Sequence, residues 1–472
     1  MKKIQRYLLA LLMMGAVMGL QGCEDYFDLE ENPNLVNNPP LSNLLSTTTH
    51  KTGLNSQRVA NTTSFFVQYL ASSVAGSSTD VYEVTDYTST WDALYLAMAD
   101  IYDMRQSALE QNASDYVGVA NILMAYHLSL VTDMWGAAPY TEAFDNSTLT
   151  PGFNSAEELY NVSLQLIDEA IEQLNQPESA VLLDPANDLI HNGNKQNWIK
   201  TAYALRARFL NKVSGTAAYD PEAVLSAVEN SYTSNADNAT MGVFETRNPW
   251  ATIALNNQNL LLGGWLSEQL IQHLNGETYG VFDPRIGQIT DTTITGEYVG
   301  TPNGAGNVGP ANNTERDESY ISLNPPLTGE DAPLIIISYP EIKFIEAEAA
   351  FRAGQRDRAY NAYLEGIRAS MALLEVDQEE ANEYLSDPVV AVGAENLTLD
   401  LIFKEKYVAT YLNPEAWNDA RRFDYQYENF TLPENAALPT FIRRVAYPQG
   451  EASKNPNTPE SPVLSEPLWW DQ

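Results

Sequence analysis

The chain has 472 residues, 44% of them hydrophobic, so it is long enough to bury a large core. Its 62 acidic side chains outnumber 26 Lys and Arg residues and give a formal net charge of −36. Such a charge repels phosphate backbones, which excludes nucleic acid as a ligand class, and it disfavours contact along an anionic lipid surface.

The N-terminal stretch predicts export and lipidation. Basic residues open the chain and an apolar run covers residues 8–20, which is the pattern of a secretory signal peptide and is shorter than the roughly 20 residues of a membrane-spanning helix. Cys23, the only cysteine, follows Leu-Gln-Gly and is similar to the lipidated cysteine of bacterial lipoproteins, although Gln21 stands where a small residue is usual. We predict a lipoprotein signal peptide over residues 1–22 and lipidation of Cys23. A plain signal peptide with an incidental cysteine is the alternative.

An acidic segment follows the cysteine and ends in two prolines. This composition predicts a tether. Residues 23–40 therefore form a lipidated tether, and residues 41–472 form a single domain. Acidic residues directly after a lipidated cysteine also resemble a signal for display on the outer face of the outer membrane, although a solvated linker would look the same.

Helical periodicity organises the first half of the domain. Ser155 and Glu158 form a capping box at the start of one helix, and Pro221 occupies the first turn of another. Short connections between consecutive helices predict antiparallel hairpins. The helices are expected over residues 56–71, 91–105, 116–134, 159–174, 198–213 and 221–229.

Residues 235–334 differ from their surroundings. They are rich in Gly, Asn, Pro and Thr, and only one helix is predicted within them, over residues 264–274. An irregular stretch of this length is usually functional or disordered, and its aromatic content argues against disorder. We therefore predict a loop-rich insertion that carries a ligand site.

Helical patterns return after a short extended run at residues 334–340. Ala347, Ala359, Tyr363 and Gly366 match the spacing of a tetratricopeptide unit. No alternation of strands and helices appears, so the predicted fold is mainly α, with about four tetratricopeptide-like hairpins as a scaffold for the insertion. The later helices are expected over residues 341–353, 356–374, 399–411 and 414–423.

Motifs of known catalytic chemistry are missing from the sequence. It contains no G-x-S-x-G elbow, no phosphate loop ending in Gly-Lys-Ser or Gly-Lys-Thr, and no HExxH. We predict no catalytic residue, no metal site and no cofactor; calcium is possible because Asp and Asn are common in the loops, but EF-hand spacing is absent. Among 62 acidic residues some pair will reach the spacing of a glycoside hydrolase in any fold, so an all-α hydrolase is kept only as an alternative.

Aromatic side chains on loops give the best chemical signal. A Trp or Tyr ring offers a flat, rigid surface to the apolar face of a sugar, and the same surface would hold an extended peptide. Each ring could instead pack beneath its own loop, and Trp91 begins a helical stripe. The predicted ligand-binding residues are Tyr82, Tyr87, Trp91, Trp250, Trp265, Tyr298 and Tyr320.

Residues 132–143 read TDMWGAAPYTEA, and residues 415–423 read EAWNDARRF. In their order along the chain, such segments resemble the SusD/RagB family of nutrient-binding outer-membrane lipoproteins, whose D-x-[FWY]-G-x-x-P-Y-x-E-A segment is similar to residues 132–143. The chain departs from the family at residues 414–418 (PEAWN), where Gly followed by Arg-Trp or Glu-Trp is common. Further marks are residues 283–285 (DPR), 339–342 (YPEI), 443–448 (RRVAYP) and 455–457 (NPN).

This resemblance implies a function and a partner. The protein would sit at the cell surface as a hinged lid on a TonB-dependent SusC-like β-barrel transporter, anchored in the outer membrane by its lipid. It would capture an oligosaccharide or oligopeptide between lid and barrel without performing chemistry. The family's pocket regions correspond to residues 76–91 and 235–320 here. A scaffold subunit with no ligand of its own is a further alternative.

Overall fold

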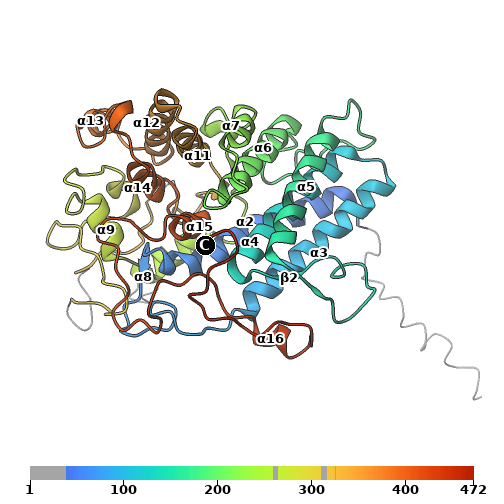
Figure 1. Cartoon of the computed structure of the whole chain (residues 1–472), viewed down its shortest axis with the longest axis horizontal. Coiled ribbons are helices and arrows are strands. Elements are labelled where there is room, and N and C mark those ends of the chain that lie inside the picture. The colour runs from blue at the N-terminus through green and yellow to red at the C-terminus, as the bar shows by residue number, and fades with distance from the viewer. Residues whose placement is uncertain (1–38, 259–263, 310–315, 325, 472) are drawn as a thin grey trace, which may run out of the picture. The chain divides into compact units, whose positions relative to one another are not determined.

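The computed structural model describes residues 39–258, 264–309, 316–324 and 326–471. The predicted signal peptide, Cys23 and most of the predicted tether lie outside the described residues. Leu41–Gln472 forms one compact unit, and the described part of it is drawn in Figure 1.

The predicted mainly α fold is confirmed. The helices of the first half are α2 (Leu41–Phe66), α3 (Thr88–Glu110), α4 (Ser114–Trp135), α5 (Ala156–Leu174), α6 (Lys195–Lys212) and α7 (Pro221–Glu229). Those of the second half are α8 (Pro249–Gln258), α9 (Glu268–Leu274), α10 (Ile286–Ile289), α11 (Tyr339–Arg352), α12 (Arg356–Leu373), α13 (Gln378–Ser386), α14 (Leu399–Ala409), α15 (Glu415–Arg422) and α16 (Gln449–Ala452). Single 3-10 turns are η1 (Asn235–Asp237) and η2 (Ala394–Asn396).

Short strand pairs tie distant segments together. All three pairs are antiparallel: β1 (Leu70–Ala71) with β5 (Trp265–Leu266), β2 (Ala138–Pro139) with β3 (Phe153–Asn154), and β4 (Ala239–Met241) with β6 (Leu334–Ile337). The first pair joins the end of the α2 region to the insertion. The third pair closes the insertion, because its two strands lie at the beginning and the end of residues 235–334.

Consecutive helices pack as hairpins, with α5, α6, α7, α11 and α12 side by side along the upper edge of Figure 1. Gly118 shows how closely α4 and α5 approach: a Cβ there would lie 2.5 Å from Leu174 Cγ. At the α11–α12 contact, a Cβ on Gly366 would lie 2.9 Å from ring atoms of Phe344. Small residues therefore set the helix spacing, while the tetratricopeptide-like character of the hairpins stays a prediction.

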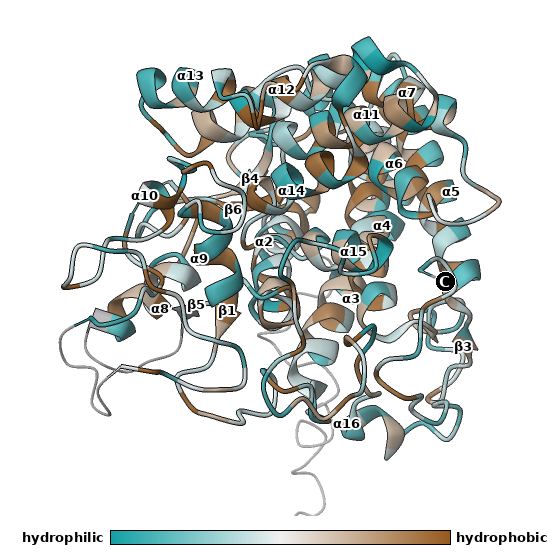
Figure 2. Cartoon of the chain, turned by 60° about the vertical axis from the view of Figure 1, so that its left-hand side comes forward, coloured by the Kyte–Doolittle hydropathy of each residue, from teal (hydrophilic) through white to brown (hydrophobic). Residues whose placement is uncertain are grey.

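Helix α4 is the centre of the core. Among the described helices it alone is long and apolar enough to cross a membrane, but its most apolar stretch is entirely buried inside the protein. Figure 2 shows the same pattern more widely, with hydrophobic residues turned inward and hydrophilic residues on the outer faces of the helices. Burial on every side is typical of a core helix.

Helix α2 begins at Leu41, although the sequence predicted a helix only around residues 56–71. Its first half is rich in Thr, which is a weak helix former. The buried threonines satisfy their hydroxyls by donating hydrogen bonds to carbonyls one turn earlier, at 2.6 Å from Thr49 to Leu45 and 2.7 Å from Thr52 to Thr48. The helix ends at Phe66, and Leu70–Ala71 are extended in β1. Tertiary packing has therefore outweighed local propensity.

The insertion contains more structure than predicted. Helix α8 was not expected, and the helix predicted over residues 264–274 starts only at Glu268. The reason is local, because Ser267 caps α9 by accepting a hydrogen bond from the Gln269 amide, and the two residues before it pair with β1. Ser114 is of a residue type that commonly caps helices, but it is the first helical residue of α4 and makes no capping bond.

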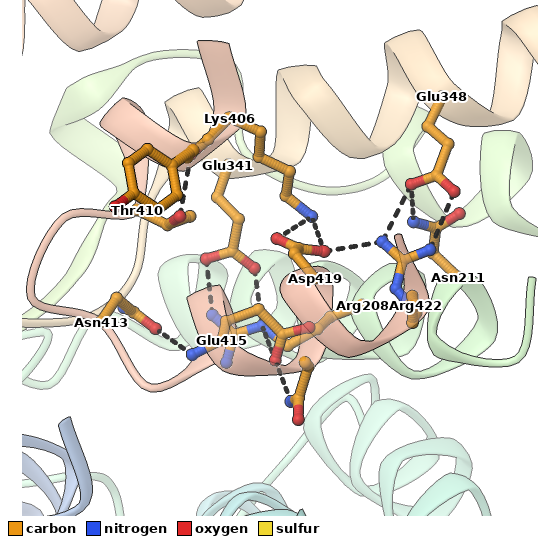
Figure 3. Close-up of polar contacts among 12 residues, drawn as sticks. Arg208, Asn211, Glu341, Glu348, Lys406, Thr410, Asn413, Glu415, Asp419 and Arg422 are labelled. Carbon is orange, nitrogen blue, oxygen red and sulfur yellow. Dashed lines mark hydrogen bonds and ion pairs between the residues drawn. The ribbon is translucent and has the colours of Figure 1, made fainter. Parts of the chain in front are cut away.

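A buried ionic network joins the hairpins to the C-terminal helices (Figure 3). Arg208 of α6 donates two hydrogen bonds of 2.6 Å to Glu341 of α11. Arg422 of α15 donates to both carboxylate oxygens of Glu348 at 2.8 and 3.0 Å. Burial works to raise the pKa of Glu348, but the guanidinium of Arg422 outweighs it and holds that pKa well below its usual range.

The network continues through α14. Lys406 contacts Asp419 at 2.9 Å, and Asp419 also accepts a 2.6 Å hydrogen bond from Arg422. On the other side, Lys212 contacts Asp133 of α4 at 2.7 Å. These side chains are almost fully buried, so each charge depends on its partner for stabilisation.

Candidate functional site

Three segments meet beside the insertion and form a junction. They are the loop at residues 72–87, the insertion segment at residues 298–309, and the C-terminal loop at residues 424–440. The first two are joined by backbone hydrogen bonds, from Gly76 to Gly304 at 2.9 Å and from Asn307 to Ser73 at 3.1 Å. The C-terminal loop is joined to both of the others by the bonds Glu434 to Asn303 at 2.8 Å and Ala437 to Val81 at 2.7 Å.

Asp80 holds this junction together. Its buried carboxylate accepts hydrogen bonds from the Asn303 side chain at 2.6 Å, from the Gly304 amide at 2.8 Å and from the Ser72 amide at 3.1 Å. Burial raises the pKa of Asp80, and these three donors oppose that rise. No cationic side chain of the described residues pairs with it, so the carboxylate is held by hydrogen bonds that come from two of the three segments.

Gly304 fits this arrangement for a steric reason. Its φ is +80°, and a Cβ there would lie 2.0 Å from the Glu434 carbonyl oxygen. A side chain would therefore force the insertion away from the C-terminal loop. Glycine permits both the positive φ and the close approach.

A polar cavity of about 200 Å³ opens at the junction. Buried amide side chains from Gln68, Gln269 and Asn303 form its floor, whereas Glu268 and Glu434 are exposed at its mouth. The residues that line the polar cavity are Gln68, Glu268, Gln269, Gln272, Pro302, Asn303, Asn429, Thr431, Leu432, Pro433 and Glu434.

Four of the predicted ligand-binding aromatics are buried, with exposed fractions of 0% for Trp265, 1% for Tyr82, and 3% for both Trp91 and Trp250. Tyr82 packs on Phe66. Trp91 also borders a groove of about 480 Å³ beside α3. The alternative considered for each ring was packing beneath its own loop, and the burial of these four rings agrees with that alternative. A ligand contact for any of them stays a prediction.

Three predicted aromatics, Tyr87, Tyr298 and Tyr320, are only half-buried. The Tyr298 ring lies 6.2 Å from that of Phe282, which is 52% exposed. The Tyr320 ring lies against Trp265, and the guanidinium of Arg316 sits 4.4 Å above it. Phe282, Tyr298 and Tyr320 are called the surface aromatic group below. Their contact with a ligand is untested, but their ring surfaces are partly accessible.

The surface aromatic group and the polar cavity share one short segment. Tyr298 and Asn303 are five residues apart in a stretch that pairs with its neighbours: the Ser319 amide donates to Val299, and the Thr301 amide donates to Leu266. An extended stretch of that length spans about 16 Å. A ligand of several units could therefore touch a ring at one end and the polar cavity at the other.

The chain matches a known protein family over most of its length. The family of SusD-like proteins described as "Starch-binding associating with outer membrane" matches residues 33–448. The chain belongs to the SusD-like family. No curated protein sequence matches it.

Solved SusD-like structures share the fold. A SusD/RagB family protein from Bacteroides thetaiotaomicron is 22% identical with a TM-score of 0.75, and the match covers 92% of this chain and 99% of that one. A SusD homologue from Bacteroides uniformis is 23% identical, with a TM-score of 0.75 and coverage of 92% and 99%. A chitin-binding SusD homologue from Flavobacterium johnsoniae is 20% identical, with a TM-score of 0.75 and coverage of 92% and 98%.

The SusD-like sequence marks lie largely in the core of this structure. Glu341 belongs to the segment 339–342, and Asp419 and Arg422 belong to the segment 415–423; all three are part of the buried ionic network. Asp283 and Arg285 form another buried pair at 2.5 Å. These marks therefore stabilise the scaffold rather than line the polar cavity.

Sequence reasoning missed the polar side of the junction. Asp80, Gln68 and Asn303 carry no motif, and the contact between Asp80 and Asn303 joins residues 223 positions apart. Phe282 was also missed, although it directly precedes the family mark at residues 283–285 in a stretch rich in Gly and Tyr. Within the described ranges no group of three or more His, Cys, Asp or Glu side chains is placed to hold a metal ion.

Proposed function

We propose that this SusD-like protein captures an oligosaccharide at the junction and delivers it to a β-barrel transporter in the outer membrane. The observation that carries the proposal is the polar cavity, which lies on the same segment as the half-exposed ring of Tyr298. Rings that cover apolar sugar faces and amides that bond hydroxyls are the two groups that a glycan needs. The family description and the chitin-binding homologue support a glycan ligand.

A glycan suits this surface better than an oligopeptide does. Extended peptides commonly bind by adding a strand to a free sheet edge. The described strands are two to four residues long and occur in two-stranded pairs, so they offer little edge for such pairing. An oligopeptide remains the second ligand class to test.

The delivery step rests on the anchor and the partner. We propose that lipidated Cys23 holds the protein at the outer surface, with the predicted tether at residues 24–40 as the link to the folded domain. The domain would then close over a TonB-dependent SusC-like transporter as a lid. The proposal includes no catalysis and no cofactor, and calcium has no assigned role in it.

Binding arrays test the ligand. Protein beginning at residue 24 is applied to glycan and peptide arrays, and any ligand found is titrated against Tyr298→Ala and Tyr320→Ala variants. We expect binding to oligosaccharides without release of product and a loss of affinity of about tenfold for the variants, because each removes a ring surface. Tyr203→Ala, at a half-buried position on α6, is the matched control.

Three outcomes would contradict the proposal. Product formation would favour the hydrolase, binding to peptides alone would exclude the glycan, and the absence of any ligand with retained binding to a barrel would favour the scaffold. Unchanged affinity in both Tyr variants, alongside glycan binding, would place the site elsewhere.

A further inference from the structure

The mouth of the polar cavity is negatively charged. Glu268 and Glu434 are exposed there, and neither makes an ion pair with a described residue. None of the eleven lining residues is Lys, Arg or His. A ligand unit that enters the cavity therefore meets two carboxylates and no compensating cation.

Several amide donors on the floor of the cavity are already committed to the protein, while one acceptor is unpaired. Asn303 has committed both of its amide hydrogens, to Leu70 at 2.9 Å and to Asp80. Gln68 and Gln269 each donate to a backbone carbonyl, at 2.6 and 3.1 Å. The side-chain carbonyl oxygen of Gln269, a residue only 7% exposed, accepts no hydrogen bond from the described residues. This oxygen is an unpaired acceptor on a residue that lines the cavity, and a ligand can satisfy it.

We infer that the polar cavity selects sugar units without negative charge, either neutral units or units that carry a protonated amine. Hydroxyl and ammonium groups donate hydrogen bonds to the carboxylates and to the free Gln269 oxygen. A uronic acid or sulfated unit places its own charge against Glu268 and Glu434, and like charges brought together at a binding surface oppose association. This inference rests on the proposed glycan function and names its ligand class.

A matched set of three ligands tests the inference. The neutral oligosaccharide that binds on the array is compared with one form in which every C6 hydroxyl is replaced by an amine and one in which every C6 is oxidised to a carboxylate. Because every unit is changed, the unit inside the cavity carries the new group whatever the register. Titration calorimetry at about 10 mM salt keeps the charges nearly unscreened, and a repeat at about 1 M salt screens them.

We expect the neutral and amine forms to bind and the carboxylate form to bind about tenfold more weakly or worse at low salt. Glu268→Gln/Glu434→Gln removes the charge at the mouth and keeps an acceptor oxygen at each position. In this variant the ratio between the affinities of the neutral and carboxylate forms should fall towards one. The control, Glu172→Gln/Glu383→Gln, removes two exposed charges on α5 and α13, away from the cavity. The control should restore little of the binding of the carboxylate form.

Two results would overturn the inference while leaving the proposed function intact. One is equal binding of the carboxylate and neutral forms to the unmodified protein. The other is equal restoration by the control pair, which would assign the selection to the net charge of −36 rather than to the cavity. Thr431→Trp, at an exposed lining position, should block the cavity and weaken every form, and unchanged affinity would show that the cavity is not the site. If no oligosaccharide binds at all, the proposed function fails as well.

Discussion

Glu348 shows what a single buried charge contributes to this fold. It accepts hydrogen bonds from Arg422, from Arg352 and from Asn211, and its side chain is 1% exposed. Glu348→Leu would leave Arg422 with one fewer partner in the core, and we expect the free energy of unfolding to fall by about 3–5 kcal/mol. Urea denaturation measures this change.

An exposed ion pair provides the comparison for Glu348. Arg206 and Asp168 contact each other at 2.9 Å with 30% and 56% of their side chains exposed. Asp168→Ala should cost about 1 kcal/mol or less, because solvent already screens the pair. Similar losses of unfolding free energy in Glu348→Leu and Asp168→Ala would contradict the assigned role of burial.

Buried histidines predict that acid weakens the fold. Burial, helped by the charge of Lys404, lowers the pKa of His273 to about 3, and burial lowers the pKa of His127 to about 4. A histidine in the unfolded chain has a pKa of about 6.5. As the pH falls below that value, the unfolded chain takes up protons before the folded protein does. The folded state therefore loses stability until the pH reaches the pKa of the buried histidine. The free energy of unfolding should drop by about 1.5 kcal/mol per such His between pH 6.5 and pH 5.

His273→Phe tests this dependence. Its ring lies between Tyr279 and Tyr407, where another aromatic ring can pack. The variant should lose stability less steeply between pH 6.5 and pH 5 than the unmodified protein. Identical slopes would show that His273 does not contribute to the pH dependence.

At the scale of elements, the contact between the 72–87 loop and the insertion depends on Asp80. Asp80→Ala removes the acceptor for three donors, and we expect the two segments to separate locally, while the rest of the fold is retained. Amide hydrogen exchange at Gly304 and Ser72 should accelerate, and glycan affinity should fall because the cavity floor loses its support at Asn303. Asp80→Asn, which keeps one acceptor oxygen, should show a smaller effect. Faster exchange with unchanged affinity would separate the loop contact from binding.

Elements with their own local signals were predictable from the sequence. The capping box of Ser155 and Glu158 and the first-turn Pro221 mark α5 and α7 where expected, because each acts within a few residues. Helix α2 was predicted too short because its Thr-rich half is stabilised by burial, which no local pattern reveals. The site was harder to predict, since Asp80 meets Asn303 only after the fold brings the two loops together. The sequence around a loop aromatic such as Trp265 also does not indicate whether its ring will be buried or exposed.

On the scale of the whole molecule, the predicted attachment to the membrane depends on residues outside the described part. Cys23→Ala removes the only thiol that could carry a lipid, and a body with a net charge of −36 is not expected to adhere to anionic lipid by itself. We expect the variant to leave the membrane fraction while keeping its helical circular dichroism. Continued sedimentation with membranes would contradict the predicted anchor.

The buried ionic network also constrains how the chain can be made. Asp133 and Arg208 emerge early in synthesis, whereas Asp419 and Arg422, which complete the network, lie within the last 60 residues. A domain can fold during synthesis only after the segments that contact each other in it have been made. Asp133 can pair with Lys212 and Arg208 with Glu341 before then, but Lys406 and Glu348 meet Asp419 and Arg422 only when α15 has been made. In a chain that is exported as predicted, the ionic network would therefore be completed only after nearly all of the domain has been synthesised.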